Sequence, residues 1–410
     1  EVAEAEAKKA VEGPDKKAAV EMAAKALAEA RKKRNSLVIE APNIANAYAV
    51  ADGTPANTKL QLRGDPKRLG DEVPRHFPLI LGGQEVPRDA NISGRLQLAE
   101  WITDPKNPLT ARVMVNRIWQ FHFGRGIVQT PNDFGTRGQA PTHPELLDYL
   151  ARQFIQSGWS IKAMHKMILQ SETWQISSGN MPLGATESSA PSLAESKARD
   201  PVVIAAMLRN IQLDPHNDLF WKFNRYRLDA ESLRDTLLFV GGGLDESPAG
   251  EHPFPPQHTW GWTQHNPFVA VYETRRRSVY LMQQRLKKNS FLALFDGADP
   301  SSSTSVRLPS TTPLQALFMM NDPLAHAQAA NFAARVISLS TDDPARISAA
   351  YQIAWNRLPT PDEQQESATF LKQYREKLAE LKTPSDQAEQ QAWAALSRAL
   401  LASNEFIYVD

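Results

Sequence analysis

The chain has no cysteine among its 410 residues. This absence excludes disulfide bonds, thiolate nucleophiles, cysteine-ligated zinc or iron–sulfur clusters and covalently attached c-type haem within the chain. An excess of either charge is also lacking, because 46 Lys and Arg residues balance 46 Asp and Glu residues. A protein that binds nucleic acid or an anionic membrane through its net charge is therefore not expected.

Long hydrophobic runs are absent as well. No window of about 18 consecutive apolar residues is present that could span a bilayer, so no transmembrane segment is expected. The first residues, EVAEAEAKKAVEG, contain no Met and neither the basic nor the apolar region of a secretory signal. We therefore expect a mature or cleaved product, or a fragment of a longer polypeptide. A hydrophobic fraction of 42% with 22% charged residues is typical of a globular protein.

The residue pattern predicts a mainly α protein: a compact multi-helix domain with a small β or extended element near the N-terminus. Residues 1–34 are rich in Ala, Glu and Lys and are expected to form a peripheral helical arm. Residues 35–92 contain recurrent Pro and short alternating runs, which predict the β or extended element. Residues 93–410 are expected to form the helical body, with insertions at about 179–212 and 246–275.

Local signals place several elements within this outline. Apolar residues recur at helical spacing near the start of the body, which predicts four helices over residues 93–103, 110–123, 142–156 and 160–171. Thr142, Thr312 and Thr360 are each followed three residues later by Glu or Gln, the signature of a capping box at a helix N-terminus. The runs Leu37–Glu40 and Ser278–Leu281 are instead predicted to be extended.

Six phrases of the sequence together carry a resemblance to a known family. They are NPLTARVMVNRIWQFHFGRGIVQTPNDFG (107–135), PTHPELLDYLARQFIQSGWSIKAMHKMILQSETW (141–174), NRYRLDAESLRD (224–235), RRSVY (276–280), TTPLQALFMMN (311–321) and LLASNEFIYV (400–409). In this order they resemble the planctomycete-type domain of unknown function usually called PSD-one. The resemblance covers about residues 45–410. The Ala-rich arm, the 179–212 stretch and the 246–275 loop depart from it.

The resemblance implies a cellular context and supplies no activity. In that family the domain typically forms the C-terminal part of large exported proteins, often with a c-type cytochrome domain further upstream. It thus implies export to the periplasm or cell surface and a protein partner, either a cytochrome-bearing chain or an upstream domain. Since the chain has no Cys-x-x-Cys-His motif, we expect no cofactor in it and place any haem c on the partner.

We therefore expect a non-catalytic interaction or assembly module of an exported, cytochrome-associated complex. The alternative is an enzyme or binding protein that acts on polysaccharide or sugar derivatives, by hydrolysis or oxidation. No Gly-x-Ser-x-Gly elbow, His-Glu-x-x-His motif or phosphate-binding glycine loop is present to select a reaction.

The helix expected over residues 110–123 carries the first candidate site. Its sequence is apolar on nearly all sides, so the helix is expected to be central and its polar side chains to be constrained. Arg112, Asn116 and Gln120 fall on one line at intervals of four, and Arg117 stands beside them. Buried Arg and Asn side chains require partners.

Two interpretations of this polar line stay open. The first is a structural network with acidic partners such as Asp133, Asp229, Glu231 or Asp235. The second is a pocket for an anionic or hydroxyl-rich ligand lined by the same residues. His122 lies on the apolar stripe of the helix, which favours a packed histidine over a ligand or a base.

The carboxylates Asp229 and Glu231 allow a further alternative. Glu231 and Arg234 lie one helical turn apart, which favours a local ion pair. Two carboxylates in this segment could also act as acid and base in a glycosidase-like site. Their spacing does not select that role, because carboxylate separation depends on the tertiary fold.

The loop expected at 246–275 is rich in Pro, His and aromatic residues. It could pack on its own domain, form a surface for a protein or glycan partner, or hold a metal ion. Its metal-ligand candidates are His252, His258 and His265. Their spacings of six and seven match no metal motif, so no metal is expected. We predict instead that Trp260, Trp262 and Tyr272 form an interaction surface.

Overall fold

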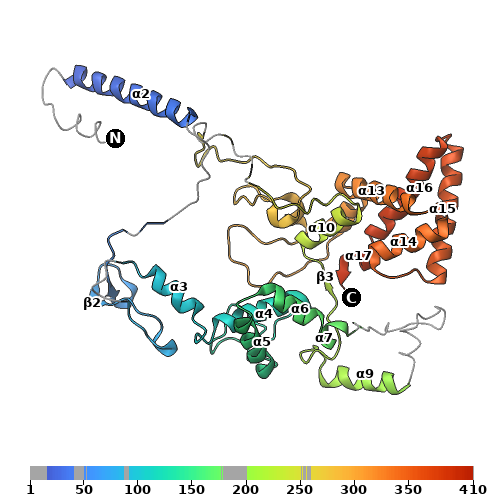
Figure 1. Cartoon of the computed structure of the whole chain (residues 1–410), viewed down its shortest axis with the longest axis horizontal. Helices are drawn as coiled ribbons and strands as arrows, with labels where there is room; N and C mark the ends of the chain where they lie inside the picture. The colour runs from blue at the N-terminus through green and yellow to red at the C-terminus, as the bar shows by residue number, and fades with distance from the viewer. Residues whose placement is uncertain are drawn as a thin grey trace. The chain divides into compact units, whose positions relative to one another are not determined.

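The structure is a computed structural model that describes residues 16–40, 50–51, 53–86, 92–176, 178, 201–250, 252, 255 and 260–409. Over these residues it is mainly helical, with 12 helices of seven or more residues (Figure 1). Two small antiparallel sheets accompany them, one of which lies near the N-terminus. The predicted fold class is confirmed.

The chain divides into two compact units. Unit 1 comprises Glu1–Gly53 and Gly250–Tyr272, and unit 2 comprises Thr54–Ala249 and Glu273–Asp410. The boundaries expected from composition, after residues 34 and 92, stay a prediction. No helix in the described part of the chain combines the length and the apolar character that crossing a membrane requires.

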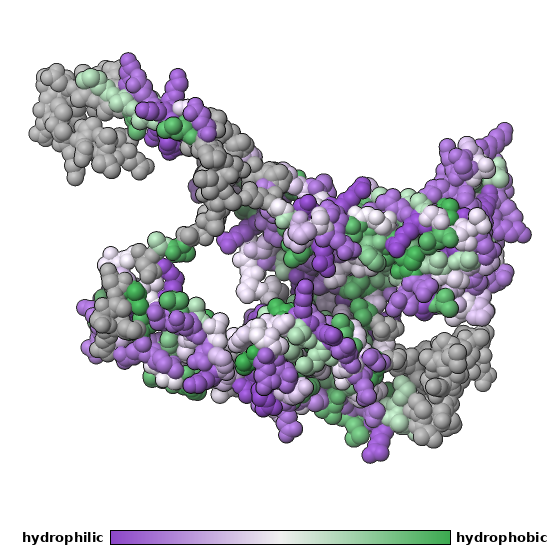
Figure 2. Space-filling view, viewed as in Figure 1, coloured by the Kyte–Doolittle hydropathy of each residue, from purple (hydrophilic) through white to green (hydrophobic). Residues whose placement is uncertain are grey.

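Unit 1 contains the helix α2, Lys16–Glu40. Figure 2 shows hydrophilic residues along it, and its side chain Met22 is largely exposed, as expected for a solvated arm. The extended run predicted at Leu37–Glu40 is wrong, because α2 continues through it. Two features favour the continuation: the Ser36 hydroxyl donates to carbonyls of the preceding turn, and the first helix-breaking proline comes only at Pro42.

The N-terminal part of unit 2 holds the predicted β element. Strand β1, Thr58–Gln61, pairs antiparallel with β2, Leu69–Val73, and the 3₁₀ turns η1, Leu62–Gly64, and η2, Leu79–Leu81, follow these strands. The helix α3, Arg95–Thr103, comes next. Phe77 stacks on Trp101 of α3, with ring centroids 4.9 Å apart, and thereby attaches this segment to the helix.

A first hydrophobic cluster is built by α4, Thr110–Phe123, α5, Pro144–Gln156, α6, Ile161–Leu169, and α7, Glu172–Gln175. The four helices predicted over residues 93–171 are confirmed within a few residues at their ends as α3, α4, α5 and α6, and α7 is an additional short helix. The capping box predicted at Thr142 is wrong, because His143 takes the N-cap position without a side-chain cap. The Thr142 hydroxyl donates to the Ile127 carbonyl instead, so a tertiary contact replaces the local one.

A second cluster is built by the C-terminal helices. These are α10, Ala230–Val240, α11, Ser290–Leu294, α12, Pro313–Asn321, α13, Pro323–Leu339, α14, Asp343–Trp355, α15, Pro361–Glu380, α16, Ser385–Leu401, and α17, Asn404–Ile407. The capping boxes predicted at Thr312 and Thr360 are confirmed. Strand β3, Tyr226–Arg227, pairs with β4, Tyr408–Val409, and residues of this ribbon pack on the first cluster.

The two predicted insertions differ in content. Residues 201–212 of the first belong to the helix α9, Pro201–Leu213, so this insertion contains regular structure. In the second, the described residues between 246 and 275 contain neither helix nor strand. The strand predicted at Ser278–Leu281 is wrong. This segment begins with the 3₁₀ helix η4, Ser278–Tyr280, because hydrogen bonds to α10, described below, hold it.

Candidate functional site

Helix α4 carries five of the predicted site residues, and they have different partners in the structure. Asn116 is completely buried, and its amide pairs with the backbone of Val128, accepting from the N–H at 2.8 Å and donating to the carbonyl at 2.9 Å. Gly126 lets this loop approach, because a Cβ there would lie 2.8 Å from Asn116 Nδ2. Asn116 is therefore a structural residue, and its partner is a backbone segment instead of an acidic side chain.

Arg112 pairs with a carboxylate that the sequence did not indicate. Its Nε donates to Asp148 Oδ1 of α5 at 2.6 Å, and its Nη1 donates to the Pro108 carbonyl at 2.6 Å. The hydrogen bond from Arg112 holds the pKa of the Asp148 carboxyl below its usual value. The expected partners were wrong for this arginine, because α4 packs against α5 and brings Asp148 closest.

Arg117 and Gln120, also on α4, contact still other parts of the chain. Arg117 Nη2 donates to Asn132 Oδ1 at 2.8 Å, and Gln120 Nε2 approaches the Ser305 carbonyl at 3.5 Å. Arg117 also lines an open apolar groove of about 650 Å³, whose walls include Trp101 and Trp159. The line of four polar residues therefore does not converge on one pocket.

A second cleft, of about 440 Å³, contains the Arg112–Asp148 pair. One wall is the loop 130–141, and the opposite wall comes from α4 and α5. Asp133, predicted as a partner of α4, instead stabilises this loop, since its Oδ1 accepts from the Gly135 N–H at 2.9 Å. Phe134 contributes an aromatic ring to the cleft, and Gln139 contributes an amide.

His122 lies beside a second histidine. Its Nε2 is 2.8 Å from His165 Nδ1 of α6, and its ring meets Trp174 edge to face at 5.2 Å. Burial and the neighbouring His165 together hold the pKa of His122 below its usual value. His122 is thus a packed, hydrogen-bonded histidine, as its place on the apolar stripe predicted.

The carboxylates Asp229 and Glu231 are engaged at the start of α10. Asp229 is the N-cap residue, and its Oδ1 accepts from the Ser232 N–H at 2.7 Å. Glu231 forms a two-pronged ion pair with Arg307, with Nη2 3.1 Å from Oε1. Asp229 thus serves as a helix cap, and Glu231 serves as one half of an ion pair.

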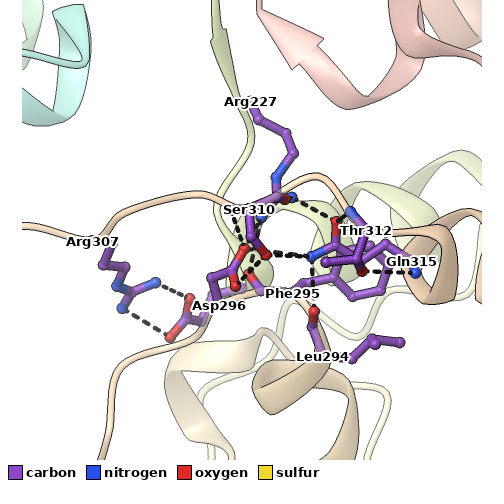
Figure 3. Close-up of polar contacts among 9 residues, drawn as sticks. Arg227, Leu294, Phe295, Asp296, Arg307, Ser310, Thr312 and Gln315 are labelled. Carbon is purple, nitrogen blue, oxygen red and sulfur yellow. Dashed lines mark hydrogen bonds and ion pairs between the residues drawn. The ribbon is translucent and has the colours of Figure 1, made fainter.

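Next to this pair lies a polar network that the sequence did not reveal (Figure 3). Arg227 of β3 donates to Asp296 Oδ2 at 2.6 Å and to Gln315 Oε1 at 2.9 Å. Asp296 also accepts from the N–H and the hydroxyl of Ser310, both at 2.8 Å. Only 6% of the Arg227 side chain is exposed, so this network joins β3, the end of α11 and the start of α12 in the protein interior.

Side chains of α10 likewise hold residues 274–278, the segment around the end of the second insertion. Arg234 of α10 donates to the carbonyls of Thr274 and Arg276, and Asp235 accepts from the N–H of Ser278 at 2.8 Å and from its hydroxyl at 2.7 Å. Asp235 was a predicted partner for α4 and serves this segment instead. The sequence offered one signal for Arg227, Arg234 and Asp296. Each is a charged residue next to apolar residues, which predicts that its side chain is paired but does not identify the partner.

The predicted aromatic surface of unit 1 is a series of neighbouring rings. Trp260 stacks on Trp262 at 5.1 Å, Trp262 contacts Phe268 at 4.5 Å, and Phe268 lies 6.4 Å from Tyr272. Trp260 Nε1 donates to the Pro255 carbonyl at 2.8 Å. None of these four rings belongs to the buried core, and 43% of Trp260 is exposed.

The weak metal alternative concerns histidines of the same loop. His252 and His265 are both exposed, whereas His258 lies outside the described residues. Over the part of the chain that the structure describes, no three His, Asp or Glu side chains are grouped so that they could hold a metal ion.

Comparison with known proteins gives one match. The model of the PSD1 family, described as a protein of unknown function (DUF1553), matches residues 94–371. No curated protein and no solved structure matches the chain. The matched range contains both hydrophobic clusters in large part, together with the Arg112 cleft and the Arg227 network.

Proposed function

This chain belongs to the PSD1 family of proteins of unknown function, and from that premise we propose that it is a non-catalytic interaction module of an exported, cytochrome-associated complex. The proposal places it in the periplasm or at the cell surface. Its partner is a cytochrome-bearing chain or upstream domain, which supplies any haem c.

One observation carries the proposal: the rings of Trp260, Trp262, Phe268 and Tyr272 contact one another outside the hydrophobic core. Large aromatic rings that are partly exposed are typical of protein interfaces, where they contribute contact area at little cost in conformational entropy. Val269 and Val271, between Phe268 and Tyr272, are also nearly half exposed and extend the apolar character of the segment.

The contacts of the predicted polar site residues also support a non-catalytic role. Asn116, Asp229 and Glu231 each satisfy a structural partner within the chain. A catalytic acid or base needs a proton-transfer position that is open to a substrate, and Arg307 holds both carboxylate oxygens of Glu231.

The test is native purification of the full chain from its own host, followed by absorbance spectroscopy of the associated chains. We expect a protein with covalently bound haem to elute with the wild-type chain. The double variant Trp260→Ala/Trp262→Ala should lose it while keeping its melting temperature. The matched control Phe121→Ala removes an exposed ring of unit 2 and should retain the partner.

Three results would contradict the proposal. A stable monomer with no associated chain would remove the assembly role. Retention of the haem protein by the double variant would move the interface away from the aromatic segment. A loss of several kcal/mol of stability in the double variant would instead show that the two rings serve as core residues.

A further inference from the structure

The cleft between the loop 130–141 and helices α4 and α5 contains an ion pair that is half open to solvent. The side chains of Arg112 and Asp148 are 35% and 42% exposed, although they are joined by a hydrogen bond of 2.6 Å. Both side chains line the cleft, so their outer atoms face its interior.

Each member of this pair keeps an unused hydrogen-bonding group. Arg112 employs Nε toward Asp148 and Nη1 toward the Pro108 carbonyl, and within the described residues its Nη2 makes no hydrogen bond. Asp148 employs Oδ1, and its Oδ2 has no partner among the same residues. The ion pair therefore keeps one unused donor and one unused acceptor. A hydroxyl group can accept from the first while it donates to the second.

The Arg112–Asp148 ion pair also determines which ligand charge suits the cleft. The positive charge of Arg112 is already balanced by Asp148, which stays ionised because its pKa is held below the usual value by that arginine. Arg152 also acts electrostatically on the Asp148 carboxylate, so two arginines and one carboxylate set the charge at the cleft. An anion meets the like charge of Asp148 and a cation meets that of the arginines, whereas a neutral polyhydroxylated molecule meets neither. The cleft thus suits hydroxyl groups.

The other lining residues match the remaining features of a sugar ring. The Thr136 hydroxyl and the Gln139 amide line the cleft, and neither side chain has a hydrogen-bond partner among the described residues. Phe134, Pro141 and Pro144 provide apolar surfaces for the C–H faces of a ring. A volume of about 440 Å³ falls within the range of small-molecule sites and has room for a monosaccharide or disaccharide.

The loop wall is held in place before any ligand arrives. The Thr130 hydroxyl donates to the Asp133 carbonyl at 2.8 Å and accepts from the Gln139 N–H at 3.0 Å. Gly138 packs so closely against the Asp133 carbonyl oxygen that a Cβ there would collide with it. Because this wall is already ordered, little conformational entropy is lost when a ligand binds.

From this geometry we propose that the Arg112–Asp148 cleft is a binding site for a neutral saccharide, in which adjacent ring hydroxyls bridge Arg112 Nη2 and Asp148 Oδ2. Thr136 and Gln139 bind further hydroxyls, and Phe134 contacts the apolar face of the ring. The site requires neither the aromatic segment of unit 1 nor a cytochrome partner, so it is independent of the function proposed above.

Saturation-transfer NMR and titration calorimetry on the full chain test this site. The probes are the neutral disaccharides cellobiose, laminaribiose, mannobiose and maltose, with glucose 6-phosphate and glucosamine as charged probes. We expect at least one neutral disaccharide to bind at millimolar concentration and the charged probes to bind more weakly. Asp148→Asn should weaken binding about tenfold, because a charge-assisted hydrogen bond is lost.

Two further variants keep the test decisive. Gln139→Ala alters an exposed side chain of the loop and should also weaken binding, even if Asp148→Asn were poorly folded. Asp245→Asn is the matched control, because Asp245 pairs with Arg276 at a similar exposure, 46% and 35%, outside the cleft. The proposal is overturned if no neutral disaccharide binds, if a charged probe binds better, or if Asp148→Asn and Gln139→Ala bind like Asp245→Asn.

Discussion

The amide of Asn116 takes the place of a neighbouring strand for Val128, since it satisfies both the N–H and the carbonyl of that residue. A buried backbone group without a partner costs free energy comparable to a lost hydrogen bond. A single polar side chain on an apolar helix therefore fixes the path of the chain that leaves α4 and leads to the Arg112 cleft.

Replacing this amide should destabilise the fold strongly. Asn116→Leu leaves two buried backbone groups of Val128 unpaired, and we expect a loss of about 2–4 kcal/mol in the free energy of unfolding. Urea denaturation followed by circular dichroism measures it. Asn132→Ala, which removes the exposed partner of Arg117, should change stability by less than about 0.5 kcal/mol. Equal effects of the two variants would show that the Asn116 contact is unimportant.

The His122–His165 pair predicts a pH dependence. The pKa of His122 is below its usual value of about 6.5 in the folded chain, because burial and then His165 disfavour its charge. The unfolded chain thus binds more protons just below pH 6.5. The stabilising contribution of neutral His122 is complete above that pH and decreases as the pH falls toward the folded pKa of His122.

Unfolding by urea at a series of pH values from neutral to mildly acidic checks this prediction. The wild-type chain should lose stability on acidification, and His122→Gln should show a shallower dependence. His265→Gln, an exposed histidine of unit 1, serves as the control and should follow the wild type. An unchanged slope in His122→Gln would contradict the assignment.

Among the elements, β3 is short but connects distant parts of unit 2. Its two residues pair with β4, and Arg227 extends from it into the network with Asp296, Ser310 and Gln315 (Figure 3). Gln315 also closes the capping box of α12 with Thr312. The start of α12 is therefore set jointly by a local cap and by a side chain that comes from far along the chain.

Replacing Arg227 should destabilise the contacts among β3, α11 and α12 together. Arg227→Met leaves the Asp296 carboxylate largely buried without its cation, and we expect a destabilisation of about 3–5 kcal/mol. Lys288→Met breaks the exposed pair with Asp299 and should cost no more than about 1 kcal/mol. Chemical denaturation of both variants distinguishes the two cases. A loss of less than about 1 kcal/mol in Arg227→Met would mean that the network contributes little to stability.

At the scale of the whole molecule, both hydrophobic clusters belong to unit 2, whereas unit 1 holds α2 and the aromatic segment. The side chains described along α2 are exposed except for the half-buried Leu27. The helix thus buries little apolar surface that could contribute to stability.

Deletion of residues 1–34 should accordingly leave the thermal unfolding of unit 2 unchanged, because neither cluster loses a residue. Differential scanning calorimetry of the full and the shortened chain compares their midpoints. A clearly lower midpoint in the shortened chain would show that α2 is a packed element instead of a peripheral arm.

The sequence by itself determined the fold class, most helices of the body and two of the three capping boxes that it predicted. Helix α4 has the bounds that its periodicity indicated, and Thr312 and Thr360 cap α12 and α15 as expected. These features are encoded within a few neighbouring residues, since helical spacing and N-caps require only local contacts. The capping box predicted at Thr142 is wrong because the Thr142 hydroxyl bonds to the Ile127 carbonyl, a contact that the neighbouring residues do not encode.

Only the tertiary structure decided which polar side chains meet. Arg112 was expected to pair with Asp133, Asp229, Glu231 or Asp235 and pairs with Asp148, while Arg227 reaches Asp296, 69 residues away. Many carboxylates satisfy the general rule that a buried arginine needs a partner. The packing of α5 against α4, and of β3 against the loop before α12, selects one of them. That selection depends on distances between helices, which no spacing along the chain records.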